Sequence, residues 1–144
     1  MQVFARDHVV VCGTDEVIAL IRQCAFHPET IEIHSLRDGE EVDEWETVMT
    51  IEGDYADFAH LETIYLGILA RQSRIATNVR RVVKAANGKP VLFFPARYDI
   101  YQTQESDGYA ALVGGIHGFS TDANALAAGG KGLGTIPHAL IASY

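Results

Sequence analysis

Apolar and polar residues alternate with two different periods in the first part of the chain. Segments 31–34 and 47–51 alternate with a period of two, which is typical of strands with one buried face. Segment 15–24 repeats apolar residues at helical spacing, and a β-rich run from Gln2 to Val11 precedes it. The order strand, helix, strand, strand predicts a small N-terminal α/β domain over residues 1–58.

Helical spacing of apolar residues resumes at Phe58. One apolar stripe predicts a helix that ends before Gln72–Ser73, and a second stripe predicts another helix over residues 75–86. Asn87–Gly88 follows, and such residues commonly end helices. We therefore expect two linking helices with a break between them.

Strands and helices alternate after residue 90. Val91–Phe94 is a continuous apolar run of strand length, typical of a strand buried on both faces of a parallel sheet. Helices are expected over residues 106–117 and 123–128, followed by a short strand that leads into Gly134–Thr135. This order predicts the opening βα units of an incomplete α/β barrel over residues 59–144, so the expected fold class is α/β (α+β). In such folds functional residues gather beyond the carboxyl ends of the strands. Arg97 and His138 both follow such predicted ends, so we expect their side chains to converge at one rim of the barrel.

Composition fits one globular unit. The 144 residues are 48% hydrophobic and 21% charged, enough for a sizeable core. No apolar stretch approaches twenty residues and the first residues lack the plan of a signal peptide, so we expect a cytoplasmic protein without a membrane partner. Cys12 and Cys24 lack metal-site spacing, so we interpret both as small core residues and predict no metal ligands in the chain.

Charge is distributed unevenly along the chain, whose net charge is −8. Of the 19 acidic residues, 15 lie before residue 63, whereas seven of the 11 basic residues lie between Arg71 and Arg97. The basic segment could hold phosphates, although it could equally be the solvated face of a helix. The acidic total, without interleaved basic and aromatic residues, argues against nucleic acid as a partner.

The segment 132–138, Gly-Leu-Gly-Thr-Ile-Pro-His, predicts an imidazole at the start of a helix. Proline is favoured in the first helical turn because its missing N–H costs nothing there, so Pro137 predicts a helix start with Thr135 as its N-cap. Backbone N–H groups and the positive end of the helix dipole would then favour an anion beside His138. A lone histidine is more often an ordinary polar residue, and that alternative stays open.

Five short motifs follow one another in an order and spacing that resemble a known family. They are Leu61-Glu62 with Leu66-Gly67, Ser73-Arg74-Ile75-Ala76-Thr77, Pro95-Ala96-Arg97, Gly114-Gly115-Ile116-His117-Gly118-Phe119-Ser120, and Leu133-Gly134-Thr135-Ile136-Pro137-His138-Ala139-Leu140. Over about residues 46–144 the chain resembles the nicotinate phosphoribosyltransferase family.

The resemblance implies a reaction, a fold and an assembly. The reaction makes nicotinate mononucleotide from nicotinate and phosphoribosyl pyrophosphate in NAD biosynthesis and salvage, coupled to ATP hydrolysis through a phosphorylated histidine that matches His138. The fold is an α/β front domain followed by an irregular α/β barrel, and the working unit is a homo-oligomer of at least two chains. Mg²⁺ is the cofactor expected with the pyrophosphate and ATP.

The resemblance also implies substrate-binding residues. Arg97 matches the arginine that meets the nicotinate carboxylate, and a planar guanidinium suits a planar anion. The alternative for Arg97 is an ion pair with Asp99 or Glu105. Ser120, and less directly Thr121, match a polar pair that holds the same carboxylate or a phosphate, and the alternative is that Ser120 only caps its helix.

Two alternatives to the nicotinate enzyme remain at the level of sequence. The related quinolinate phosphoribosyltransferase carries an arginine directly after the glutamate that matches Glu62, to hold the second carboxylate of its substrate, whereas this chain has Thr63. Thr63 therefore favours nicotinate. Because relatives are much longer, the chain is also expected to be a fragment, so a non-catalytic ligand-binding or oligomerisation role is the other alternative.

Overall fold

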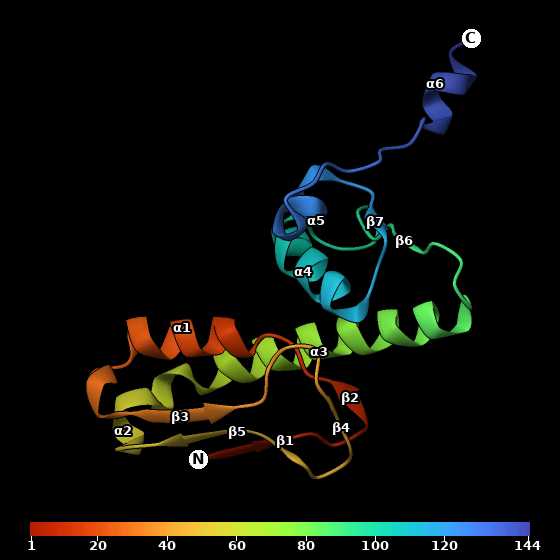
Figure 1. Ribbon diagram of the computed structural model, residues 1–144. Helices are drawn as coiled ribbons and strands as arrows, with labels where there is room; N and C mark the ends of the chain where they lie inside the picture. Colours follow the sequence, from red (N-terminus) through yellow and green to blue (C-terminus); the bar gives the residue numbers. More distant parts are fainter.

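An antiparallel sheet and a small parallel pair of strands lie at different positions along one long helix (Figure 1). The computed structural model describes residues 1–144. Together the sheets and helices form an α/β (α+β) fold, as expected from the sequence.

The N-terminal sheet has the strand order β1-β5-β3, and both pairs are antiparallel. Its strands are β1 (Gln2–Phe4), β3 (Glu32–Ser35) and β5 (Thr47–Glu52). A second antiparallel pair joins β2 (Val9–Val10) to β4 (Glu41–Val42). The single strand predicted over residues 2–11 is wrong, because the exposed polar segment 6–8 separates β1 from β2.

Helices α1 (Thr14–Cys24) and α3 (Glu62–Ala85) pack against this sheet and bury its apolar face. Short helical segments at Pro28–Thr30, Tyr55–Phe58 (α2) and Ala59–Leu61 connect the longer elements. The core between helices and sheet holds nine buried residues: Val17, Ile21, Ile31, Met49, Ile51, Phe58, Leu61, Tyr65 and Leu69.

Helix α3 is continuous, so the break predicted at Gln72–Ser73 is wrong. Gln72 is buried and donates a hydrogen bond to the carboxylate of Glu16 in α1. The Ser73 hydroxyl accepts a hydrogen bond from the backbone N–H of Cys12, with N and O 3.0 Å apart. Polar residues that looked like a helix boundary are instead interior positions, whose partners lie far away in the sequence.

The second region alternates short strands with helices. It contains β6 (Leu92–Phe93), a helical turn at Tyr101–Thr103, α4 (Gln104–Gly114), β7 (Gly118–Phe119), α5 (Asp122–Ala125), a turn at Leu126–Ala128 and α6 (His138–Ala142). Strands β6 and β7 pair in parallel, which confirms a βα unit.

Two strand predictions in this region are wrong. Only Leu92 and Phe93 of the run Val91–Phe94 are paired, and Leu92 is 46% exposed, so the strand is not buried on both faces. No strand leads into Gly134–Thr135, although the Leu133 N–H donates to the Phe119 carbonyl at the end of β7.

Glycine allows α4 to lie directly against its neighbours. A Cβ at Gly114 would stand 2.7 Å from the Val79 Cβ of α3, and a Cβ at Gly108 would stand 2.0 Å from the Asn124 carbonyl oxygen. Neither space admits a methyl group. The position of α4, and hence of the loops on either side of it, depends on these two glycines.

Residues 133–144 are exposed throughout, and α6 extends away from the other elements (Figure 1). None of the helices combines the length and the apolar character needed to cross a membrane. Cys12 is buried as expected, whereas the burial predicted for Cys24 is wrong, because Cys24 lies exposed at the end of α1.

Candidate active site

Two of the expected site residues follow the ends of neighbouring parallel strands. Ser120 directly follows β7, and its N–H donates to the Phe93 carbonyl over 3.0 Å, which places it beside the end of β6. Arg97 lies four residues beyond β6 itself, in an exposed turn. Carboxyl ends of parallel strands share one edge of a sheet, so the loops of Arg97 and Ser120 open on the same edge.

The turn that carries Arg97 is built on Pro95. The Pro95 carbonyl accepts hydrogen bonds from the N–H groups of Tyr98 and Asp99, over 2.8 and 3.2 Å. The guanidinium of Arg97 makes no hydrogen bond or ion pair within the chain. A free guanidinium on a closed turn can meet a planar carboxylate with two parallel hydrogen bonds.

Asp99 does not pair with Arg97, so the alternative of an Arg97 ion pair with Asp99 or Glu105 is wrong. Asp99 accepts instead from the guanidinium of Arg71 over 3.2 Å. Sequence reasoning missed Arg71, because only its place in a basic helix was visible. The sequence held one signal for its role. Few acidic residues follow residue 62, and any of them that is buried needs a basic partner.

Thr121, and not Ser120, caps the following helix. Its hydroxyl oxygen accepts from the Asn124 N–H over 3.2 Å, and the hydroxyl also lies 2.8 Å from the Gln104 side-chain oxygen. The Ser120 hydroxyl has only a long contact of 3.5 Å, to the Asn124 side-chain oxygen. Of the expected pair, Ser120 is therefore freer to bind a ligand, whereas Thr121 is occupied in the structure.

His138 stands apart from Arg97 and Ser120. It is the first residue of α6, and Pro137 occupies the N-cap position with an extended backbone. The predicted cap by Thr135 is wrong, since no side chain caps this helix. No strand leads into this helix, and it lies well away from β6 and β7 (Figure 1). The expectation that His138 follows a strand end and converges with Arg97 is therefore wrong for this structure.

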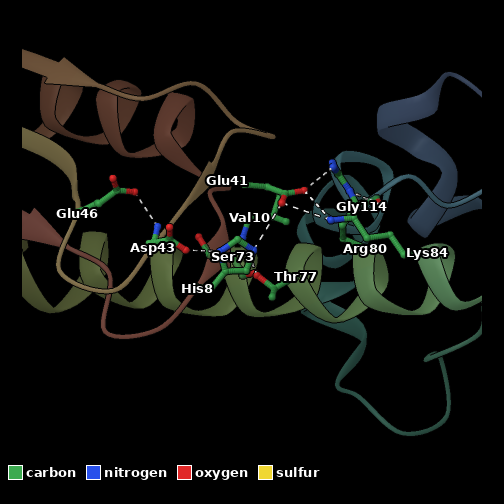
Figure 2. Close-up of polar contacts among 10 residues, drawn as sticks. All are labelled: His8, Val10, Glu41, Asp43, Glu46, Ser73, Thr77, Arg80, Lys84 and Gly114. Carbon is green, nitrogen blue, oxygen red and sulfur yellow. Dashed lines mark hydrogen bonds and ion pairs between the residues drawn. The ribbon is translucent and has the colours of Figure 1, made fainter.

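Ion pairs neutralise part of the basic segment of α3. Glu41 in β4 lies 3.0 Å from Arg80 and 3.3 Å from Lys84, and His8 lies beside it (Figure 2). The hydrogen bond from Lys84 lowers the pKa of Glu41 below its usual range. Arg80 also donates to the carbonyls of Val113 and Gly114 at the end of α4. These two bases hold elements together and are not free for phosphate.

Two other arginines of α3 face open space. Arg74 and Arg81 line a groove of about 810 Å³ between α3 and the β1–β2 segment, together with Arg6. None of these three side chains makes an ion pair within the chain. The basic segment is thus divided between structural cations and exposed ones. The exposed ones fit the interpretation as a solvated helix face, and phosphate binding by them stays a prediction.

Solved structures share the arrangement of an antiparallel sheet, a long helix and parallel βα units. The nicotinate-nucleotide pyrophosphorylase of Pyrococcus furiosus is 36% identical with a TM-score of 0.85, over 95% of this chain and 34% of its own. The enzyme of that description from Ehrlichia chaffeensis is 20% identical with a TM-score of 0.70, over 79% of this chain and 41% of its own. Human nicotinic acid phosphoribosyltransferase is 15% identical with a TM-score of 0.80, over 99% of this chain and 35% of its own.

These matches define the class of fold as that of the pyridine phosphoribosyltransferases, and those below 25% identity establish the fold alone. The chain spans between 34% and 41% of the length of these structures. The family described as quinolinate phosphoribosyl transferase, N-terminal domain, matches residues 1–73, which is half of the chain. The chain belongs to this family. The resemblance inferred from the motifs is confirmed for the wider family, although the matching family is described by the quinolinate enzyme and not by the nicotinate enzyme.

Proposed function

We propose that the protein is a phosphoribosyltransferase of NAD biosynthesis that acts on a pyridine carboxylate. The observation that carries the proposal is the unpaired Arg97 beyond β6, beside the Ser120 loop beyond β7, in a chain 36% identical to the Pyrococcus furiosus enzyme over 95% of its length. Such an edge of a parallel sheet is where α/β enzymes bind their substrates.

Nicotinate is the substrate that we propose, with nicotinate mononucleotide as the product. At the start of α3 the residue after Glu62 is Thr63, which is exposed and carries no charge. A substrate with one carboxylate needs one guanidinium, which Arg97 supplies. By the resemblance, the residue that matches Thr63 holds the second carboxylate of quinolinate, and Thr63 offers that carboxylate no cationic partner.

For this reaction the protein mainly has to position the two reactants and to supply positive charge near the leaving pyrophosphate. The pyridine nitrogen attacks C1 of the ribose while the bond from C1 to the pyrophosphate oxygen breaks, and the electron pair leaves with pyrophosphate. The transition state resembles an oxocarbenium ion, as in glycoside cleavage. In this scheme Arg97 fixes the ring through its carboxylate and the Ser120 hydroxyl donates a further hydrogen bond, so that the nitrogen stays in line.

His138 is the residue that we propose to accept a phosphoryl group from ATP. A neutral imidazole is nucleophilic near neutral pH, and His138 is exposed at the first position of α6. For phosphorylated His138 to affect the transfer, α6 must approach the Arg97 turn in the working enzyme. A homo-oligomer of at least two chains would offer one route for that approach.

Magnesium is the cofactor that we propose for the polyphosphate substrates. No group of three or more His, Cys, Asp or Glu side chains in the chain is arranged to hold a metal ion. The residues of the chain therefore do not fit a metal site of their own. Mg²⁺ would arrive with phosphoribosyl pyrophosphate or ATP.

Quinolinate is the second candidate substrate, and the matching N-terminal family favours it. With quinolinate the transfer would be followed by loss of one carboxylate as CO₂. The two candidates share the Arg97 subsite and differ only in what holds the second carboxylate.

A comparison of acceptors tests the proposal on the complete enzyme. Nicotinate, quinolinate and nicotinamide are each supplied with phosphoribosyl pyrophosphate and Mg²⁺, and the mononucleotide products are separated and quantified. We expect product from nicotinate at a rate well above that from quinolinate. Faster turnover of quinolinate would mean that quinolinate, and not nicotinate, is the substrate. If none of the three acceptors gave product, the proposed class of reaction would be wrong.

A labelling experiment tests the role of His138. Radiolabelled ATP should transfer its terminal phosphoryl group to the enzyme, and the acid-labile label should be absent from the variant His138→Ala. The matched control His34→Ala changes an exposed histidine of β3 and should keep the label. A label that persists in His138→Ala would remove this residue from the ATP step.

A further inference from the structure

The turn that carries Arg97 is tied to the helices through one arginine. We propose that Arg71, held by Asp107 and paired with Asp99, is a positioning residue that orders this turn and so presents Arg97 to the substrate carboxylate. The inference rests on the proposed function, in which Arg97 binds the substrate carboxylate. The order of the turn, however, can be measured without substrate.

The first observation is the firm attachment of Arg71 to α4. Its Nε and one terminal nitrogen each lie 2.8 Å from an oxygen of Asp107, a bidentate pair. The Asp107 side chain is 1% exposed, so solvent does not reach the ion pair through Asp107. The hydrogen bonds that Arg71 donates to Asp107 raise the pKa of Arg71 above its usual range, and the guanidinium remains charged.

The second observation is that the same guanidinium extends to the turn. A terminal nitrogen of Arg71 lies 3.2 Å from the Asp99 carboxylate and 3.2 Å from the Thr103 hydroxyl. The Thr103 hydroxyl also donates to Asp107 over 2.9 Å. Arg71 thus spans α3, α4 and the segment that follows β6.

The third observation is that few other contacts hold the turn. At its end the Ile100 carbonyl accepts from the N–H and the hydroxyl of Thr103, over 3.3 and 3.1 Å. Residues 97–102 are all exposed, and Tyr98 is 85% exposed. Backbone hydrogen bonds to Pro95 close the turn on itself but do not fasten it to any helix. Asp99 is the residue of the turn whose side chain pairs with a helix, and that partner is Arg71.

Ordering the turn in advance strengthens binding because the entropy of fixing its residues is lost on folding and not on binding. Arg71 itself need not touch the substrate. Removal of its link to the turn should weaken binding of the pyridine carboxylate and leave binding of phosphoribosyl pyrophosphate and the chemical step nearly unchanged.

The test uses Asp99→Ala in the complete enzyme. Asp99 is 44% exposed, so its loss should not prevent folding. Glu105→Ala is the matched control, since it removes an exposed acid of α4 that has no partner within the chain. Asp99→Glu restores a carboxylate one methylene further out and should recover most of the wild-type behaviour.

Amide hydrogen exchange without substrate measures the order of the turn. We expect exchange at residues 97–100 to become at least fivefold faster in Asp99→Ala and to stay unchanged in Glu105→Ala. In kinetics, we expect KM for the pyridine carboxylate to rise about fivefold to tenfold in Asp99→Ala, with kcat and KM for phosphoribosyl pyrophosphate within twofold of wild type.

Unchanged exchange in Asp99→Ala would overturn the inference, whatever the kinetics show. Faster exchange with an unchanged KM for the acceptor would also overturn it, provided that Arg97→Ala raises that KM. If Arg97→Ala leaves acceptor binding intact, the proposed carboxylate subsite fails instead, and the exchange result still decides whether Arg71 and Asp99 order the turn.

Discussion

Tyr65 carries a buried polar group without a partner. Its ring lies in the core between α3 and the sheet, and its hydroxyl makes no hydrogen bond. Burial raises the pKa of this hydroxyl to about 12, so it stays protonated and its donor is unsatisfied. An unpaired buried hydroxyl costs about 1–3 kcal/mol of desolvation.

The variant Tyr65→Phe removes that cost and keeps the ring. We expect its free energy of unfolding to increase by about 1 kcal/mol, measured by urea denaturation with an unchanged m-value. Tyr55→Phe is the control, because the Tyr55 hydroxyl donates to Glu62 and its loss should not stabilise the protein. A Tyr65→Phe variant less stable than wild type would mean that the hydroxyl has a partner in the working protein.

Helices α3 and α4 meet at a glycine. A methyl group at Gly114 would collide with Val79 of α3, whereas Gly67 on the exposed face of α3 has no atom within 4 Å of its would-be Cβ. We expect Gly114→Ala to lower the free energy of unfolding by about 1–3 kcal/mol through overpacking. Gly67→Ala should raise it by about 0.5–1 kcal/mol, because alanine favours a helix interior. Thermal unfolding of the two variants measures both changes in stability. Equal changes in Gly114→Ala and Gly67→Ala would contradict the packing described.

Strand β4 is fastened to α3 through Glu41, whose pKa is lowered mainly by its hydrogen bond from Lys84 and also by Arg80. A lowered pKa in the folded state means that the stabilisation is present above the unfolded pKa and is lost as the pH falls through the folded pKa. We expect Glu41→Gln to melt below wild type at about pH 7 and to approach it at about pH 3. The variant Glu44→Gln is the control, since Glu44 is exposed and unpaired. A difference that persists at low pH would assign the effect to packing and not to charge.

Elements with a clear period could be predicted from the sequence, and elements fixed by distant partners could not. The period-two segments became β3 and β5, and the amphipathic segment 15–24 became α1. The break expected at Gln72–Ser73 failed because Glu16 and Cys12 satisfy these polar side chains across the fold. No local pattern could reveal those partners.

Much the same division holds for the candidate site. The placement of Arg97 beyond a strand end was predictable, because it follows from the order of strands and helices. The same expectation for His138 failed, because no strand forms before α6. The pairing of Asp99 with Arg71 was not, since it joins residues 28 positions apart through a buried acid on a third element. Roles for Arg97, Ser120, Thr121 and His138 stay predictions.

The molecule as a whole exposes many large apolar side chains after residue 91. They are Leu92, Phe94, Tyr98, Ile100, Tyr101, Leu112, Leu126, Leu133, Ile136, Leu140, Ile141 and Tyr144. Surface of this kind drives association. We expect the 144-residue chain to self-associate, so that light scattering gives a mass above 15.7 kDa that rises with concentration. A monomer at all concentrations would show that these side chains are covered within one chain.

If Arg97 holds the carboxylate of the pyridine substrate, as we propose, the enzyme should discriminate against an uncharged acceptor through this side chain. The measurement is the ratio of kcat/KM for nicotinate to that for nicotinamide, in the complete wild-type enzyme and in Arg97→Gln. Hydrogen bonds to a charged group contribute about 1.5–3 kcal/mol, so the account predicts that the ratio falls about tenfold to a hundredfold in the variant. An unchanged ratio would contradict it, because the carboxylate would then be recognised by some other group.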